Sequence, residues 1–181
     1  MRKKLLWITE TAIMLALLVT LQALTKPMGQ LVTGSCVNAV LAVSALVGGP
    51  GSGLTVAVIS PVLAYLLGIA PQILTVPAIM AGNAVYVLLL SLLADKTGRN
   101  PLKQAIAWAV AAAAKFAALY LIVVKIICGV LSENLLAAGT LKEPMLKALP
   151  ATFSWPQLFT ALIGGAVALL IVPGIRKALH K

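Results

Sequence analysis

The chain alternates between long apolar segments and short breaks that contain glycine, proline or charged residues. A helix that rises ~1.5 Å per residue needs roughly 20 apolar residues to cross the ~30 Å hydrocarbon core of a bilayer. We therefore expect six helices, at about Leu5–Leu24, from near Cys36 to the glycines at 48–53, from these glycines to Gly68, at about Gln72–Ala94, at about Leu102–Cys128, and from Trp155 to just before Pro173. This pattern predicts an all-α membrane protein, a compact bundle of six transmembrane helices.

The breaks between these segments predict loops and turns. KPMGQLVTGS, after the first helix, is rich in turn formers and in hydrogen-bonding groups, which is typical of a loop. GGPGSG lacks the Lys-Ser/Thr ending of a phosphate-binding loop, so we interpret it as a tight hairpin between two short helices. Ser60-Pro61 predicts a kink in the third helix. The mixed stretch at 131–155 is expected to hold a short amphipathic helix at the membrane interface.

Composition supports a membrane location. The chain has 181 residues, of which 61% are hydrophobic and 10% charged, whereas about a quarter of the residues of a soluble domain are charged. The mean hydropathy is +1.07. Residues 1–181 are expected to form a single domain. The N-terminus resembles a signal peptide, but its apolar run is interrupted at Glu10 and continues to Leu24, so we interpret it as a retained first helix.

The basic residues predict the orientation of the bundle. The net charge of +10 does not form a stripe with interleaved aromatic residues, so we expect no binding of nucleic acid. If the N-terminus is inside, the inner side carries Arg2, Lys3, Lys4, Lys96, Arg99, Lys103, Arg176, Lys177 and Lys181, and the outer side carries Lys26, Lys142 and Lys147. The positive-inside rule therefore predicts that both termini are cytoplasmic.

The inventory of reactive residues argues against an enzyme. The single histidine is His180, and the four acidic residues lie at or beyond the ends of the expected helices. No catalytic pair, metal site or cofactor site can be assembled from them at membrane depth. Cys36 and Cys128 lack CxxC spacing and are expected to be buried free thiols. A disulfide between them is the alternative, because both should lie near the same face of the membrane.

Lys115 is the unusual residue of the fifth helix. It lies about 13 residues from Leu102, near the centre of the bilayer, where a lysine costs about 2.5–3.5 kcal/mol on insertion scales. No carboxylate is expected at its depth, and Asn83 reaches a similar level and can bond it. Two interpretations stay open. Lys115 is either a buried structural amine, or it lines a polar cavity in which the ligand is its missing counter-ion.

Other polar residues converge on the outer half of the bundle. Asn83 and Tyr86 share a face of their helix, because they are three residues apart. Ser154 is a candidate N-cap of the last helix, whose start directs the positive end of its dipole into the bundle. The candidate substrate-binding residues are Lys115, Asn83, Tyr86, Gln157, Trp155, Lys125, Tyr120, and, from the first outer loop, Gln30, Thr33 and Asn38. For Lys125 and Trp155, anchoring at the membrane surface is an equal alternative.

Six short helices in about 180 residues, with Ala12-xxx-Ala16 on the first helix, resemble the substrate-binding S component of energy-coupling factor (ECF) vitamin transporters. The stretch Gly29–Gly68 is similar to the hairpin of helices 2 and 3 in that family. The resemblance implies high-affinity capture of a vitamin or related micronutrient at the outer face of a bacterial cytoplasmic membrane. It further implies docking of Ala12 and Ala16 on a transmembrane coupling subunit, and uptake powered by two ATPase subunits. Lys115 suggests that the ligand is anionic.

Two alternatives come from other classes of protein. A stand-alone channel or passive facilitator for small solutes would expose polar residues through both leaflets, whereas here they become sparse toward the cytoplasmic half. A structural assembly subunit would leave Lys115 unexplained.

Overall fold

The computed structural model describes residues 2–69, 72–95 and 100–179, with side chains from residue 4 onward. The helices are α1 (Arg2–Thr25), η1 (Lys26–Met28), α2 (Gln30–Val47), α3 (Gly49–Leu66), η2 (Ile73–Thr75), α4 (Val76–Leu93), α5 (Pro101–Leu119), η3 (Tyr120–Val130), α6 (Ser132–Ala137), α7 (Glu143–Thr152) and α8 (Trp155–Ala178). Within these ranges, six helical stretches are long and apolar enough to cross a membrane. The prediction of an all-α bundle of six spans is confirmed. The orientation of the termini stays a prediction.

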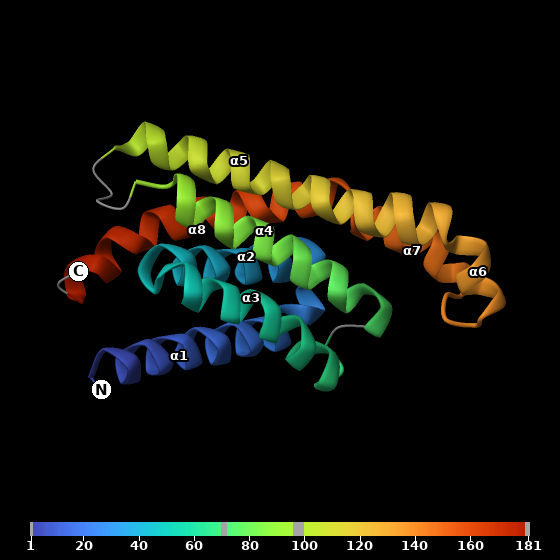
Figure 1. The fold of residues 1–181 in the computed structure, drawn as a ribbon, viewed down its shortest axis with the longest axis horizontal. Helices are drawn as coiled ribbons and strands as arrows, with labels where there is room; N and C mark the ends of the chain where they lie inside the picture. The colour runs from blue at the N-terminus through green and yellow to red at the C-terminus, as the bar shows by residue number, and fades with distance from the viewer. Residues whose placement is uncertain (1, 70–71, 96–99, 180–181) are drawn as a thin grey trace.

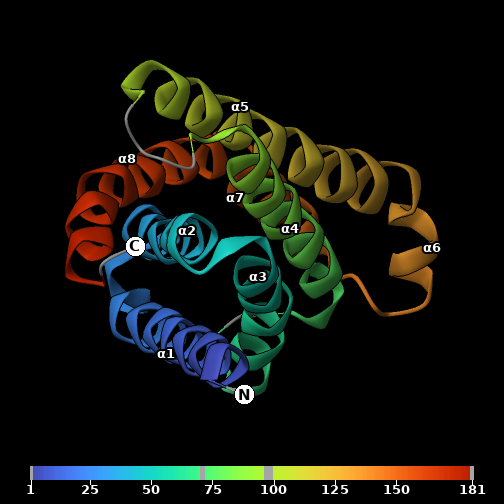
Figure 2. The ribbon, with the colours of Figure 1, turned by 60° about the vertical axis from the view of Figure 1, so that its left-hand side comes forward.

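The second helix is the centre of the bundle. Figure 2 shows α2 surrounded by α1, α3, α4 and α8, and its residues Leu41 and Ala42 are fully buried. Both chain ends lie at one end of the molecule, and α6 lies at the other (Figure 1). Consequently the C-terminal end of α1 and the N-terminal ends of α2, α4 and α8 meet at the end of the bundle that is away from the termini.

Small residues allow α8 to pack directly on α2. A Cβ atom on Gly164 would lie 2.7 Å from the backbone nitrogen of Ala39, which is closer than atoms can pack. A Cβ atom on Gly165 would collide with Trp108, whose indole nitrogen donates to the carbonyl of Leu162 at 3.0 Å. This close approach brings polar residues of α2 and α8 within hydrogen-bonding distance of each other.

Several expected boundaries were wrong. The loop expected up to Ser35 ends at Gly29, whose φ of +89° makes the turn, so α2 starts at Gln30 rather than near Cys36. The hairpin expected over 48–53 is confined to Gly48 and Gly49, because Pro50 fits the first turn of α3. The last helix continues through Pro173 to Ala178.

Two further expectations were also incorrect. The stretch at 131–155 holds two short helices, α6 and α7, instead of one. Ser154 precedes α8, but its hydroxyl donates to the carbonyl of Ala151 at 3.4 Å and does not cap the helix.

Proline 61 lies inside α3, and the helix continues on both sides of it. Because proline has no N–H, the carbonyl of Ala57, four residues earlier, loses its usual helical partner. The side-chain amide of Asn83 on α4 donates to this carbonyl at 3.5 Å. Pro61 therefore creates the acceptor that orients a polar side chain of the neighbouring helix.

We predict that Pro61→Ala releases Asn83. The new backbone N–H should bond Ala57 and raise the free energy of unfolding by about 1 kcal/mol, the net contribution of one hydrogen bond. NMR on protein labelled with ¹⁵N-asparagine, of which the chain has four, should show a shift of the Asn83 side-chain amide. Pro173→Ala, a matched change in a helix far from Asn83, should leave that signal in place. Identical Asn83 spectra in wild type and Pro61→Ala would contradict this account.

Candidate substrate-binding site

Lys115 lies at the middle of the helix formed by α5 and η3, and only 3% of its surface is exposed. Its ammonium group donates to Asn38 Oδ1 at 2.5 Å and to Asn83 Oδ1 at 2.7 Å. The ammonium also lies 5.5 Å from the centre of the Tyr86 ring, a cation–π distance. These three partners are neutral, so they solvate the charge without compensating it. The predicted bond to Asn83 is present, and Asn38 is a second partner.

The orientation of both amides is set by the groups around them. Asn38 Nδ2 donates to the carbonyl of Gly34 at 2.9 Å and to Thr160 Oγ1 at 3.2 Å. Asn83 Nδ2 donates to the carbonyl of Ala57. With their donors used on α2, α8 and α3, the two amides must present their oxygens to the lysine. Asn83 itself lies on α4. Four helices besides α5, namely α2, α3, α4 and α8, therefore contribute to the surroundings of the Lys115 amine.

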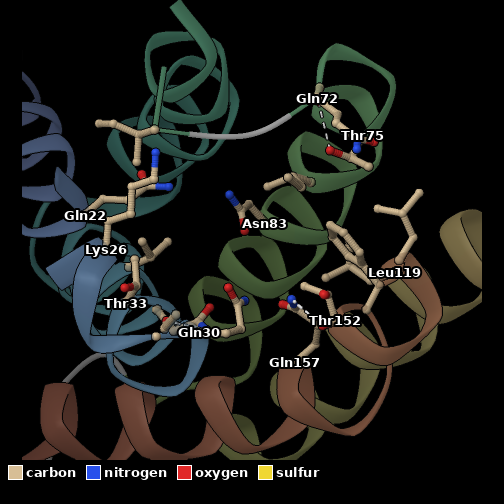
Figure 3. Close-up of a pocket in the computed structure, with 18 of the residues that line it drawn as sticks. Gln22, Lys26, Gln30, Thr33, Gln72, Thr75, Asn83, Leu119, Thr152 and Gln157 are labelled. Atoms are coloured by element: carbon tan, nitrogen blue, oxygen red, sulfur yellow. Dashed lines mark hydrogen bonds between the residues drawn. The ribbon is translucent and has the colours of Figure 1, made fainter. Parts of the chain in front are cut away.

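A cavity of about 400 Å³ adjoins this amine. Its lining comprises Gln22, Lys26, Gly29, Gln30, Thr33, Gly34, Val37, Asn38, Ile69, Gln72, Thr75, Ile79, Asn83, Lys115, Leu119, Ala148, Leu149, Thr152, Phe153 and Gln157. The view in Figure 3 shows polar side chains of α1, η1 and α2 along one side, Leu119 and Thr152 along the opposite side, and Asn83 between them. The cavity thus combines many hydrogen-bonding groups with an aliphatic wall. A volume of this size is typical of small-molecule sites.

The structure brings six of the ten predicted residues to this cavity: Lys115, Asn83, Asn38, Gln30, Thr33 and Gln157. Gln30 and Thr33 lie on the first turns of α2 and not in a loop as expected. Tyr86 lies behind the cavity, fully buried, and its hydroxyl donates to the carbonyl of Ala161 at 3.2 Å.

Three of the predicted residues, Trp155, Lys125 and Tyr120, lie on the periphery of the bundle and not in the cavity. Trp155 is 62% exposed and stacks on Phe116 at 5.5 Å between ring centres. Lys125 lies over the ring of Tyr120, at 5.7 Å from its centre. The buried positions of this long helix are Ala107, Ala111, Ala112, Lys115, Leu119, Val123 and Ile127. Apart from Ala112, they recur every four residues in α5 and in the π-helix from Tyr120 alike, and positions 120 and 125 lie outside this series.

Sequence reasoning missed five polar residues of the lining: Gln22, Lys26, Gln72, Thr75 and Thr152. Gln22 and Lys26 are four residues apart at the end of the first helix, and this spacing was a weak local signal. The expected loop concealed it, because the loop separated Lys26 from that helix, and Gln30 lies beyond the turn at Gly29. Lys26 was instead counted only among the basic residues that predict the orientation of the bundle.

The described residues offer no site for a metal, since no three of their His, Cys, Asp and Glu side chains cluster. Cys36 and Cys128 are free thiols, so the alternative of a disulfide is wrong. Both are half-buried rather than buried.

A family model described as "ECF transporter, substrate-specific component" matches residues 7–176. No curated protein and no solved structure matches the chain. The match covers nearly the whole chain, including every helix that lines the cavity. This multi-pass membrane protein therefore belongs to the family of substrate-specific components of ECF transporters.

Proposed function

We propose that the cavity captures an anionic, vitamin-like small molecule at the outer face of a bacterial cytoplasmic membrane, with Lys115 as its counter-charge. The observation that carries this proposal is the set of partners of Lys115. Two of the three ammonium protons are used by Asn38 and Asn83, and one remains for a group in the cavity. A carboxylate there would supply the charge compensation that neutral amides cannot supply.

Packing between Lys115 and the end of the bundle that holds the termini favours a binding pocket over the alternative of a channel. Toward the end of the bundle that holds the termini, each helix around the site continues with buried apolar residues. These are Leu41 on α2, Leu90 on α4, Ala111 on α5 and Ala168 on α8, each at most 1% exposed. A solute path through both leaflets would need open space or available polar groups at this level, and the buried Ser44 donates to the carbonyl of Val40 in its own helix. The cavity is consequently accessible from one end.

The first helix is suited to contact a partner. Of the six spans, α1 is the least buried within the described bundle, and both Ala12 and Ala16 are exposed on it. Small residues four apart allow another helix to approach closely. We propose that this face docks on the transmembrane coupling subunit, and that two ATPase subunits drive uptake through it.

The test of the binding site is Lys115→Met, which keeps the apolar stem and removes the charge. In a thermal-shift panel, carboxylates such as biotin, pantothenate, nicotinate and folate are the expected stabilisers, whereas the thiamine cation is not. The affinity for the stabilising carboxylate should fall at least 100-fold in Lys115→Met, because a buried charge loses its partner. Calorimetric titration measures this change.

Lys115→Met also removes the donor to two buried amide oxygens, so some loss of stability is expected in any case. Titrations are therefore performed well below the melting temperature of the variant. Lys125→Met, a matched change on the outer surface of the same long helix, should keep wild-type affinity. If Lys115→Met also binds with unchanged affinity, Lys115 is a structural amine and the proposal fails.

The docking face is tested by replacing Ala12 and Ala16 with tryptophan. These residues point away from the cavity-lining part of the bundle, so carboxylate binding by the purified double variant should stay within about twofold of wild type. Uptake by cells that express the complete transporter should be abolished, because the partner helix can no longer approach. Normal uptake by the double variant would refute docking at this face.

A further inference from the structure

A second lysine lines the same cavity as Lys115. Lys26 lies in η1, directly after α1, and is exposed. Its ammonium group donates one hydrogen bond, to the carbonyl of Gly68 at 2.8 Å. Because an ammonium has three donors, further N–H groups of Lys26 are available to a molecule in the cavity.

The two lysines lie at opposite ends of the cavity. Gln30 and Asn38 lie on α2, and both line the cavity. Thr75, directly before α4, and Asn83 on α4 also line it. Each pair is eight residues apart, which corresponds to about 12 Å along a helix. Lys115 is bonded to the two asparagines, at the inner end of this distance. Lys26 precedes the turn at Gly29, after which α2 starts at Gln30, so it lies at the outer end.

The charge of the cavity is uncompensated. Among the described residues that line it, two are lysines and none is acidic. A single anion bound at Lys115 would leave the charge of Lys26 without an opposite charge in the lining. Six carboxamide side chains also face the cavity: Gln22, Gln30, Asn38, Gln72, Asn83 and Gln157. The amide donors of Asn38 and Asn83 are used on neighbouring helices, but the four glutamines can donate to anionic oxygens.

The position of Lys26 is unusual for a residue that only sets topology. It lies at the end of the bundle away from both termini, where the positive-inside rule disfavours lysine if the termini are cytoplasmic. Gln22, four residues before it, and Gln30, just after the turn at Gly29, line the same cavity. A cation surrounded by amides at the mouth of a pocket has the composition of an anion-binding subsite.

We infer that Lys26 is a second substrate-binding cation, and that the substrate is a two-headed dianion whose anionic groups lie on the order of 10 Å apart. One anionic group binds Lys115 at the inner end, and the other binds Lys26 at the mouth. This inference rests on the proposed function, which requires the anion at Lys115 alone. The second cation adds selectivity for length and for charge at both ends.

The test compares dianions with monoanions of the same skeleton. Purified protein is titrated with adipate, suberate and sebacate, and with the monomethyl ester of each acid. At least one dicarboxylate should bind about two- to fivefold more tightly than its monoester, the range expected for an exposed charge pair. Because that pair is exposed to solvent, the preference should decrease as ionic strength rises.

Variants assign the preference to a residue. Lys26→Gln should bind the dicarboxylate and its monoester equally well, while Lys147→Gln, a matched change of an exposed lysine outside the cavity, should keep the preference. The inference is overturned if wild type does not discriminate within any pair, if Lys26→Gln still discriminates, or if no dicarboxylate binds. Binding of monocarboxylates that depends on Lys115 and not on Lys26 would refute the second cation and leave the proposed function intact.

Discussion

Burial of one ammonium group is the constraint on which the arrangement of this bundle depends. A lysine at mid-membrane costs several kcal/mol unless its protons find acceptors. Lys115 finds them in Asn38 and Asn83, and each asparagine in turn needs acceptors for its own amide. The amide of Asn38 donates to Gly34 and Thr160, and the amide of Asn83 donates to the carbonyl that Pro61 leaves without a helical partner. Close packing of α8 on α2, which Gly164 makes feasible, brings Thr160 within reach. Pro61, Gly164 and the two asparagine amides thus all help to accommodate the buried charge of Lys115.

The same constraint separates two ends of the molecule. Around Lys115 and toward the end of the bundle away from the termini, polar side chains line an open cavity. Toward the end that holds the termini, each neighbouring helix continues with small or branched apolar residues. The exposed face of α1 with Ala12 and Ala16 belongs to the part of that helix before Leu18, which is buried. Capture of substrate and contact with a partner can therefore use different surfaces of one small bundle. This division fits a substrate-specific component that depends on other subunits for energy.

Hydropathy alone predicts the number and type of spans, because length and apolarity decide which segments can lie in a bilayer. It also predicts Lys115 and Asn83 as neighbours, since both count to mid-membrane depth. It fails at Gly29, where one glycine replaces the expected loop and extends α2 by more than a turn. It fails again after Tyr120, because hydropathy does not show that the buried positions Lys115, Leu119, Val123 and Ile127 exclude Tyr120 and Lys125 from the cavity. Lys26 was missed because its cavity is formed by several helices, and the four-residue spacing of Gln22 and Lys26 does not by itself reveal that assembly.

The account is tested most directly by an experimental structure of the protein in lipid, bound to a carboxylate that stabilises it. We predict a carboxylate oxygen within about 3 Å of Lys115 Nζ, the distance of a charge-assisted hydrogen bond, with the molecule inside the cavity at the end of the bundle away from the termini. A carboxylate bound elsewhere, with Lys115 still bonded to Asn38 and Asn83 alone, would contradict the central claim.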